Sequence, residues 1–324
     1  MKKGKISQNQ WNRSVEKKIL YRSRRLVERP SAGSDTLMYQ LLPETIVSST
    51  MYTETSPVEI LGKKAFYRMY NALLAAGTRA EGMQVQLLLP ESASEQQIKN
   101  IMGQLGQYGA AYEVDTGRVH TEISELVKAP LLTLSGFGKQ CAKETGSSRF
   151  RPGQQIVMTK WAGAAGAAEL AYKEKESLVK YFPAVYVDEA IEYLWEKTGG
   201  EPLFSIEKET KLAGDMGARA FHNVAKNGVF GALWELAELS HAGLEVDFEA
   251  IPVRQESIEI CERYGINLYE TDSLGSLLIG TEHGEELVHR LRAEGIPADV
   301  IGRVTDGNDR TICRGEETRF LTPP

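Results

Sequence analysis

The chain has 324 residues, of which 42% are hydrophobic and 25% are charged, and its formal net charge is −6. This is the composition of a soluble globular protein with room for two domains of ordinary size. No apolar run approaches the ~18 residues of a membrane span, and no signal-peptide core follows the basic first residues. We therefore expect a cytoplasmic protein that does not bind a membrane.

Basic residues are concentrated at the start of the sequence. Residues 1–30 contain ten Lys or Arg against Glu16 and Glu28, which leaves 42 acidic and 28 basic residues beyond position 30. A basic segment can bind nucleic acid, an anionic ligand or an acidic partner, or it can form the solvated face of a packed helix. Because the rest of the chain is acidic, we predict a packed basic leader over 1–30 and no nucleic-acid binding.

Strands and helices alternate after the leader. The first half predicts strands at 45–50, 83–89, 111–114 and 131–137, a helix at 63–76, and a second helix that begins with the capping-box pattern Ser92-Ala93-Ser94-Glu95. This alternation is typical of an α/β or α+β domain. A loop at 138–153, rich in Gly, Ser and charge, separates the two halves. We predict one domain over 31–145 and another over 150–324.

The second half predicts a further mixture of strands and helices. Strands are expected at 155–159, 244–248, 277–279 and 300–304, and helices after the small residues 163–168 and at 187–197, 228–239, 255–264 and 285–294. Gly265 and Gly295 follow the last two helices, where glycine tolerates the left-handed backbone of a helix C-cap.

Two glycine-containing segments each have two interpretations. Gly163-Ala164-Ala165-Gly166 could present backbone N–H groups to a phosphate, although close helix–strand packing explains its small residues equally well. The segment from Asn223 to Gly228, which contains Lys226, could hold an anion at a helix N-terminus. Ordinary N-capping by Asn227 is the simpler explanation.

His120-Thr121-Glu122 places an imidazole, a hydroxyl and a carboxylate together, as at a strand end. Such a group can orient a ligand or coordinate Mg²⁺, but taken alone it is better explained as exposed polar loop residues. The three cysteines, Cys141, Cys261 and Cys313, form neither a disulfide framework nor a zinc pattern. The sequence therefore predicts no dedicated metal site, and it predicts that Cys261 is buried on the apolar side of a helix.

The order of the motifs along the chain is more informative than any one of them. The first half contains Gly33-Ser34-Asp35, Leu87-Leu88-Leu89-Pro90-Glu91 and His120-Thr121-Glu122. The second half contains Val157-Met158-Thr159-Lys160-Trp161-Ala162-Gly163 with Gly166, Gly228-Val229-Phe230-Gly231-Ala232-Leu233-Trp234-Glu235, Ile251-Pro252-Val253-Arg254 and Gly275-Ser276-Leu277-Leu278-Ile279. In this order they resemble the aminoimidazole-ribonucleotide-synthetase-like superfamily, in particular its hydrogenase maturation factor branch, over essentially the whole chain.

The resemblance implies a two-domain α/β (α+β) fold. The N-terminal domain, a mixed sheet with helices, pairs in a dimer, and ATP with Mg²⁺ lies at that interface and phosphorylates an oxygen of the substrate. It places cofactor-binding positions at Asp35, Asn71, His120, Thr121, Glu122, Lys160, Gly163, Gly166, Asn223, Lys226 and Gly228. It leaves the catalytic residue unknown.

The sequence departs from this family mainly at carboxylates. At or near positions where the family has acidic residues, this sequence has Ser34, Met51 and Ala72. The dipeptide Arg118-Val119 stands where the family has Gly-Gly, and Asn223 stands where it has the Asp of an Asp-x-Thr-x-Gly-Gly motif. Magnesium polyphosphate chemistry needs several carboxylates, so ATP and Mg²⁺ binding are both in doubt. Lys160, Lys226 and Arg118 would instead give a positive lining for a small anion.

Carbamoyl-dehydrating members of the branch also end in a reactive cysteine, whereas this sequence ends Thr322-Pro323-Pro324 and has Cys313 on a predicted strand.

Two hypotheses about function follow from these departures. The first is a non-catalytic member with a degenerate ATP site that acts as a binding or partner subunit, in a homodimer or in a heterodimer with a related protein. The alternative is an ATP-dependent enzyme with an altered site that phosphorylates or dehydrates an unknown small substrate.

Overall fold

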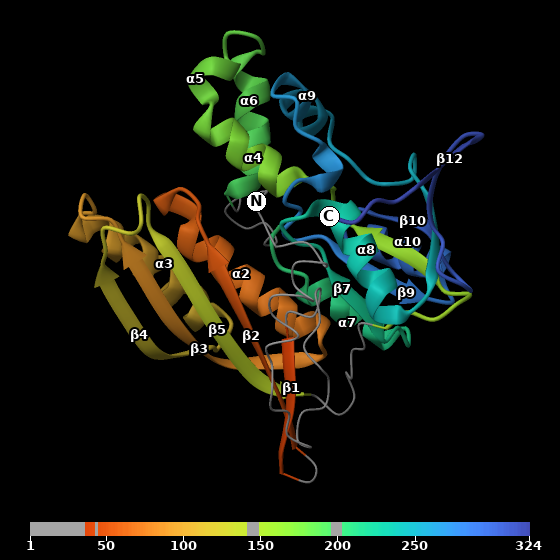
Figure 1. The fold of residues 1–324 in the computed structure, drawn as a ribbon, viewed down its shortest axis with the longest axis horizontal. Helices are drawn as coiled ribbons and strands as arrows, with labels where there is room; N and C mark the ends of the chain where they lie inside the picture. Colours follow the sequence, from red (N-terminus) through yellow and green to blue (C-terminus); the bar gives the residue numbers. More distant parts are fainter. Residues whose placement is uncertain (1–35, 43–44, 141–148, 196–202) are drawn as a thin grey trace. The chain divides into compact units, whose positions relative to one another are not determined.

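The computed structural model describes residues 36–42, 45–140, 149–195 and 203–324. The basic leader, Asp35 and Cys141 lie outside the described residues. The described chain forms two compact units, one within 36–140 and the other within 149–324. Within the described ranges, no helix has the length and apolar character needed to cross a membrane. The predicted α/β (α+β) class is confirmed, because each unit combines a sheet with helices (Figure 1).

The first unit is built on a five-stranded sheet with the order β1-β2-β5-β3-β4. Its strands are β1 (Thr36–Leu42), β2 (Thr45–Glu54), β3 (Thr78–Leu89), β4 (Asp115–Ile123) and β5 (Leu131–Gln140). All strand pairs are antiparallel except β3 with β4, which are parallel. In β5 the even-numbered residues 132–138 are buried and their odd-numbered neighbours are more accessible, so one face of the sheet carries the core.

Helices α2 (Val58–Ala75) and α3 (Glu95–Ala111) pack on this buried face. The predicted helix at 63–76 is confirmed but begins five residues earlier, directly after Pro57. The capping box lies two residues later than predicted. The Ser94 hydroxyl accepts from the Gln97 backbone N–H, and the Gln97 side chain accepts from the Ser94 backbone N–H. Gln97 is the N3 residue of α3, so Ser94 rather than Ser92 is the N-cap.

The predicted strand at 111–114 is wrong. Helix α3 continues to Ala111, and the Val114 backbone N–H donates to the Gly109 carbonyl at 2.8 Å. Glu113 takes the left-handed conformation, with φ of 56°. This arrangement is a Schellman-type helix end, which usually carries Gly at the left-handed position. Because Glu occupies that position here, no local signal marks the helix end, and the strand begins only at Asp115.

The second unit contains a seven-stranded sheet with the order β12-β11-β8-β10-β6-β9-β7. Its strands are β6 (Gln155–Thr159), β7 (Ala220–Asn223), β8 (Gly243–Asp247), β9 (Leu277–Thr281), β10 (Ala298–Thr305), β11 (Arg310–Arg314) and β12 (Glu317–Phe320). The four strands predicted in this half are confirmed, and β10 and β9 extend slightly beyond the prediction.

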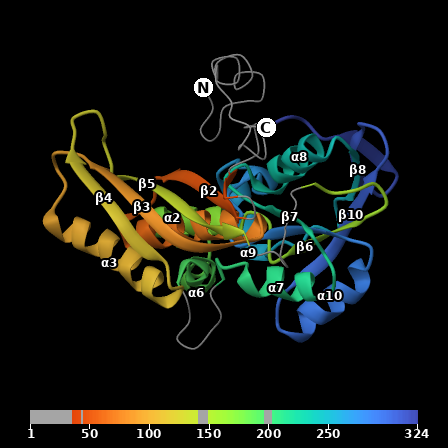
Figure 2. The same cartoon turned by 90° about the horizontal axis from the view of Figure 1, so that it is seen from below.

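Helices cover both faces of this sheet. They are α4 (Ala164–Lys173), α5 (Lys175–Leu178), α6 (Ala184–Ile191), α7 (Glu207–Asp215), α8 (Gly228–Ser240), α9 (Gln255–Arg263) and α10 (Gly284–Ala293), with 3₁₀ turns η2 (Glu192–Leu194) and η3 (Leu268–Glu270). Figure 2 shows α8 on one side of the strands and α7 with α10 on the other. Helices α4, α6 and α9 pack together in a separate apolar cluster.

Two helices of the second unit, α9 and α10, end at the glycines that the sequence predicts. Gly265 and Gly295 have φ of 64° and 77°, so both occupy the left-handed position predicted for them. The predicted helix at 187–197 is shorter than expected, because α6 ends at Ile191 and η2 follows it. Cys261 is fully buried on α9, as predicted.

Candidate functional site

The predicted binding residues fall in both units. Asn71, His120, Thr121 and Glu122 belong to the first unit, and Lys160, Gly163, Gly166, Asn223, Lys226 and Gly228 belong to the second. The second group is the more informative, because long-range contacts bring its three glycines around one short segment, Leu268–Ser273.

The three glycines are packed against this segment. A Cβ atom at Gly163 would collide with Leu268, one at Gly166 with Thr271, and one at Gly228 with the backbone of Tyr269–Thr271. Gly163 and Gly228 also have φ of 66°, which disfavours any other residue. The small residues therefore permit close contact between α4, α8 and the chain around η3. This is the packing interpretation of the glycine motif.

The backbone N–H groups of the glycine segment are also used within the protein. The Gly163 N–H donates to the Ser273 hydroxyl at 2.7 Å, and the Gly166 N–H donates to the Asp272 carbonyl at 2.8 Å. A phosphate could accept from these two groups only if it displaced Ser273 and Asp272. The segment that resembled a phosphate loop is thus closed by its own chain.

Lys160 is buried beside an acidic partner that the sequence analysis missed. Its Nζ atom lies 2.6 Å from Oε1 of Glu209, with the two side chains 8% and 2% exposed. The same ammonium donates to the carbonyls of Ser205 and, at 3.2 Å, Gly275. Because its charge is already neutralised, Lys160 does not provide the predicted positive lining. Glu209 is 49 positions away in the sequence, and no local spacing pattern connects the two.

Asn223 differs from the other residues of this group. It ends β7, and its side-chain nitrogen and oxygen are buried without a hydrogen-bond partner among the described residues. Buried amides of this kind usually bind a water or a ligand. Lys226 is half-buried in the following turn. Asn227 occupies the N-cap position of α8, but its side chain makes no capping hydrogen bond, so the predicted side-chain N-cap is wrong.

In the first unit, Asn71 is fully buried on α2, whereas His120, Thr121 and Glu122 are exposed near the end of β4. Nε2 of His120 lies 3.3 Å from Oε2 of Glu122, and about half of each side chain is exposed (52% and 56%). Since side chains two positions apart in a strand share a face, this contact follows from local geometry. The side chain of Arg118 lies outside the described residues.

A model of the AIR synthase related protein family, C-terminal domain, matches residues 151–313, which is half of the chain. The chain belongs to this family. The match covers β6 through most of β11 and includes Lys160, the three packed glycines and Asn223.

Relatives of this AIR synthase related protein include hydrogenase maturation proteins. It is 24% identical over 259 residues to a carbamoyl dehydratase HypE from Rhodobacter capsulatus, covering 76% of this chain and 72% of the relative. It is 22% identical over 284 residues to the carbamoyl dehydratase HypE of Rhizobium leguminosarum bv. viciae, covering 84% and 77%. These similarities agree with the predicted hydrogenase maturation branch.

Solved structures of HypE share the fold. HypE in a HypE–HypF complex superposes with a TM-score of 0.72 at 17% identity, over 89% of this chain and 93% of that one. HypE in complex with ATP gives a TM-score of 0.71 over 93% and 90%, also at 17% identity. A ThiL chain complexed with AMPPCP and TMP gives 0.65 at 17% identity, over 88% and 90%.

Few of the described positions predicted to bind the cofactor carry a carboxylate. Magnesium polyphosphate is held by carboxylates, and Glu122 is the only carboxylate among the described positions predicted to bind the cofactor. Within the described ranges, no three His, Cys, Asp or Glu side chains are grouped so that they could hold a metal ion. Asp35, the other predicted carboxylate, lies outside the described residues.

Cys313 is part of the β11–β12 hairpin, where it pairs with Thr318, and its Sγ lies 3.6 Å from the Thr318 hydroxyl. The prediction that Cys313 lies on a strand is confirmed. A thiol held in a sheet is restricted to the positions that the strand allows, unlike a thiol on a terminal arm. This difference bears on the chemistry available to the protein.

Proposed function

We propose that this AIR synthase related protein is a binding or partner subunit of the hydrogenase maturation branch and does not turn over ATP. The observation that carries the proposal is the internal use of the predicted phosphate-binding groups. Gly163 and Gly166 donate to Ser273 and Asp272, and the Lys160 ammonium pairs with Glu209. Each contact would have to break before these groups could bind a nucleotide.

The position of Cys313 supports the same proposal. A cysteine that carries a group through an ATP-dependent conversion must reach the ATP site and react as a thiolate. Cys313 is instead held between strands of a sheet edge, beside Thr318. We therefore propose that this chain does not perform the thiol-dependent dehydration for which its carbamoyl dehydratase relatives are named.

The open face of the first unit's sheet is the surface we propose for a partner, either a second copy or a related chain. Helices α2 and α3 pack on the other face. On the open face Met51 is 65% exposed and Phe137 is 40% exposed, and their strands β2 and β5 are neighbours in the sheet. Exposed apolar side chains on adjacent strands are typical of a protein interaction surface. One structural neighbour is itself half of a two-protein complex, HypE with HypF.

The test is calorimetric titration of the full chain with ATP, with and without Mg²⁺, together with a measurement of phosphate release. We expect no magnesium-dependent phosphate release above that of a matched solution without protein. Magnesium-dependent micromolar binding accompanied by hydrolysis would contradict the proposal. In that case Glu122→Gln tests the predicted site, because Glu122 is exposed and an ATP site that uses it must lose activity in this variant.

The alternative, an ATP-dependent enzyme with an altered site, is favoured by one specific observation. The buried amide of Asn223 has no partner among the described residues, so a ligand could supply one. ATP is present in a structure of HypE and AMPPCP in a structure of ThiL. If the alternative holds, Asn223→Leu abolishes nucleotide binding without unfolding the protein. If Asn223 only binds water, nucleotide behaviour is the same in this variant as in the wild type.

A further inference from the structure

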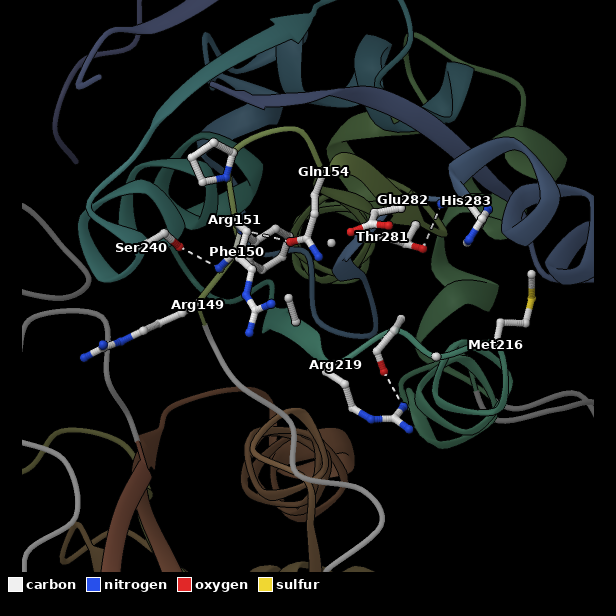
Figure 3. Close-up of a pocket in the computed structure, with 15 residues that line it drawn as sticks. Arg149, Phe150, Arg151, Gln154, Met216, Arg219, Ser240, Thr281, Glu282 and His283 are labelled. Atoms are coloured by element: carbon white, nitrogen blue, oxygen red, sulfur yellow. Dashed lines mark hydrogen bonds between the residues drawn. The ribbon is translucent and has the colours of Figure 1, made fainter. Parts of the chain in front are cut away.

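The second unit contains a pocket at the opposite end of β6 and β7 from the family's glycine motifs. Residues 149–154 precede β6, residues 216–220 lead into β7, and residues 280–283 end β9, and together they enclose a volume of about 640 Å³. Figure 3 shows these side chains around the opening. Pockets of roughly 300–1,000 Å³ accommodate small organic ligands. The pocket lies entirely in one unit, and none of the predicted cofactor-binding residues contributes to it.

The loop before β6 is held firmly in place. The Phe150 backbone N–H donates to the Ser240 hydroxyl at 2.9 Å, and the Arg151 N–H donates to Oε1 of Gln154 at 2.9 Å. The Phe150 ring is buried against Gly280, where a Cβ atom would lie 2.6 Å from the ring. Because the backbone is fixed, the position from which the Arg151 side chain extends is also fixed, and its guanidinium makes no hydrogen bond or ion pair with any described residue.

A second arginine reaches the pocket from the loop between α7 and β7. Nη1 of Arg219 donates to the carbonyls of Gly214 and Ala218, both at 2.7 Å. These contacts orient the guanidinium and leave its remaining N–H groups available. Arg149 also lines the pocket, but Figure 3 shows it pointing away from the other labelled side chains, so it is left out of the site.

The charges of Arg151 and Arg219 are not neutralised by the described part of the protein. Other arginines of the described ranges form ion pairs with carboxylates, for example Arg68 with Glu54 and Arg310 with Glu238. Arg151 and Arg219 have no carboxylate within ion-pair distance among the described residues, although Glu282 lines the same opening. Two guanidinium groups without acidic partners match a dianion, and the guanidinium fork is suited to phosphate oxygens. The first turn of α10 already carries Glu285 and Glu286, so the helix N-terminus is not the anion site.

We propose that this pocket binds a small phosphate monoester. Its phosphate accepts hydrogen bonds from Arg151 and Arg219, and a hydroxyl or amino group elsewhere on the ligand donates to the Glu282 carboxylate. The proposal does not depend on whether the family's nucleotide site is functional, because the two sites share no residue.

The experiment is calorimetric titration of the full chain with glycerol 2-phosphate, with glycerol and acetate as uncharged and singly charged probes. We expect saturable binding of glycerol 2-phosphate, weakened about tenfold or more by Arg151→Gln, because a charge-assisted hydrogen bond is lost. Arg290→Gln is the matched control, since Arg290 is an exposed arginine of α10 outside the pocket. The Arg151 side chain is exposed and makes no hydrogen bond or ion pair with a described residue, so Arg151→Gln should leave the fold intact, and a thermal unfolding curve of the variant checks this.

Three results would overturn the proposal. The first is the absence of saturable glycerol 2-phosphate binding. The second is equal weakening by Arg151→Gln and Arg290→Gln, which would indicate general charge attraction. The third is acetate binding as tight as that of the phosphate ester, which would refute recognition of a dianion. Failure of ATP to bind does not affect any of these outcomes, so this test and the test of the proposed function are independent.

Discussion

The ammonium of Lys160 lies 2.6 Å from the carboxylate of Glu209, and both side chains are buried. Lys160 also has a left-handed backbone, with φ of 57°, directly after β6. The pair joins the end of this strand to α7, while the lysine's bond to the Gly275 carbonyl joins it to the loop before β9. We infer that Lys160 organises the end of the sheet instead of binding a ligand.

Breaking this pair should destabilise the protein strongly. Glu209→Ala leaves a buried ammonium without its counter-charge, and such changes cost about 3–5 kcal/mol of unfolding free energy. The double variant Lys160→Met, Glu209→Leu should lose less than Glu209→Ala alone. Urea denaturation of each variant measures the effect. The control is Lys173→Met, which removes the more exposed pair with Glu169 and should cost about 0.5 kcal/mol or less. Equal losses from Glu209→Ala and Lys173→Met would show that Lys160 is not structurally important.

Two glycine-to-alanine substitutions should have opposite effects on stability. Both Gly103 and Gly166 lie inside helices, where alanine is intrinsically better by roughly 1 kcal/mol. A Cβ atom at Gly103 meets nothing within 4 Å, so Gly103→Ala should stabilise the protein. A Cβ atom at Gly166 collides with Thr271, so Gly166→Ala should destabilise it by about 1–3 kcal/mol. Thermal or urea unfolding compares the two. If Gly166→Ala is neutral, the packing explanation of the glycine motif fails.

The buried thiol of Cys261 should make stability depend on pH in the alkaline range. Burial raises the pKa of Cys261 to about 11. The unfolded chain loses this proton near pH 8.5, whereas the folded protein keeps it until about pH 11, so the folded state holds more protons between these values. Its stability therefore falls as pH rises through this window, by at most about 1.4 kcal/mol per pH unit.

Urea unfolding at pH 8, 9 and 10 tests this expectation by comparing the wild type with Cys261→Ala. The difference in unfolding free energy between the two proteins should shrink or change sign as pH rises. Only the wild type has the buried thiol, and its stabilising effect on the folded state is lost as pH rises. Cys313→Ala serves as the control and should follow the wild-type slope. Parallel curves for the wild type and Cys261→Ala would contradict the prediction.

The proposed partner surface can be tested by charge insertion. Met51→Glu places a carboxylate on the open face of the first unit's sheet, where Met51 is 65% exposed. If this face holds a partner chain, burial of the new charge opposes association. We therefore expect the dissociation constant of the Met51→Glu complex to be at least tenfold higher than that of the wild type. Val185→Glu is the matched control, because Val185 is an equally exposed apolar residue (70%) on α6. Sedimentation of the three proteins decides the question. Identical association of Met51→Glu and wild type would exclude this face.

The sequence by itself determined the fold class, most of the strands and helices, and the family. These features depend on periodicity and on local signals such as the glycines after α9 and α10, which act over a few neighbouring residues. It failed where a local signal was missing or ambiguous. Glu113 took the left-handed position that usually carries glycine, and two serines stood close enough to compete as the N-cap of α3.

Only the tertiary structure decided what the predicted binding residues contact. The sequence left phosphate binding and close packing as equal explanations for Gly163 and Gly166, and the segment that fills the space beside them lies more than 100 positions later, at Leu268–Ser273. The charge of Lys160 predicts a positive lining, and no local pattern connects it with Glu209, yet the fold places their charged groups in contact. Residue spacing specifies which side chains share a helix or strand face, but contacts between elements are set by how those elements pack, and here packing determined which charges remain available.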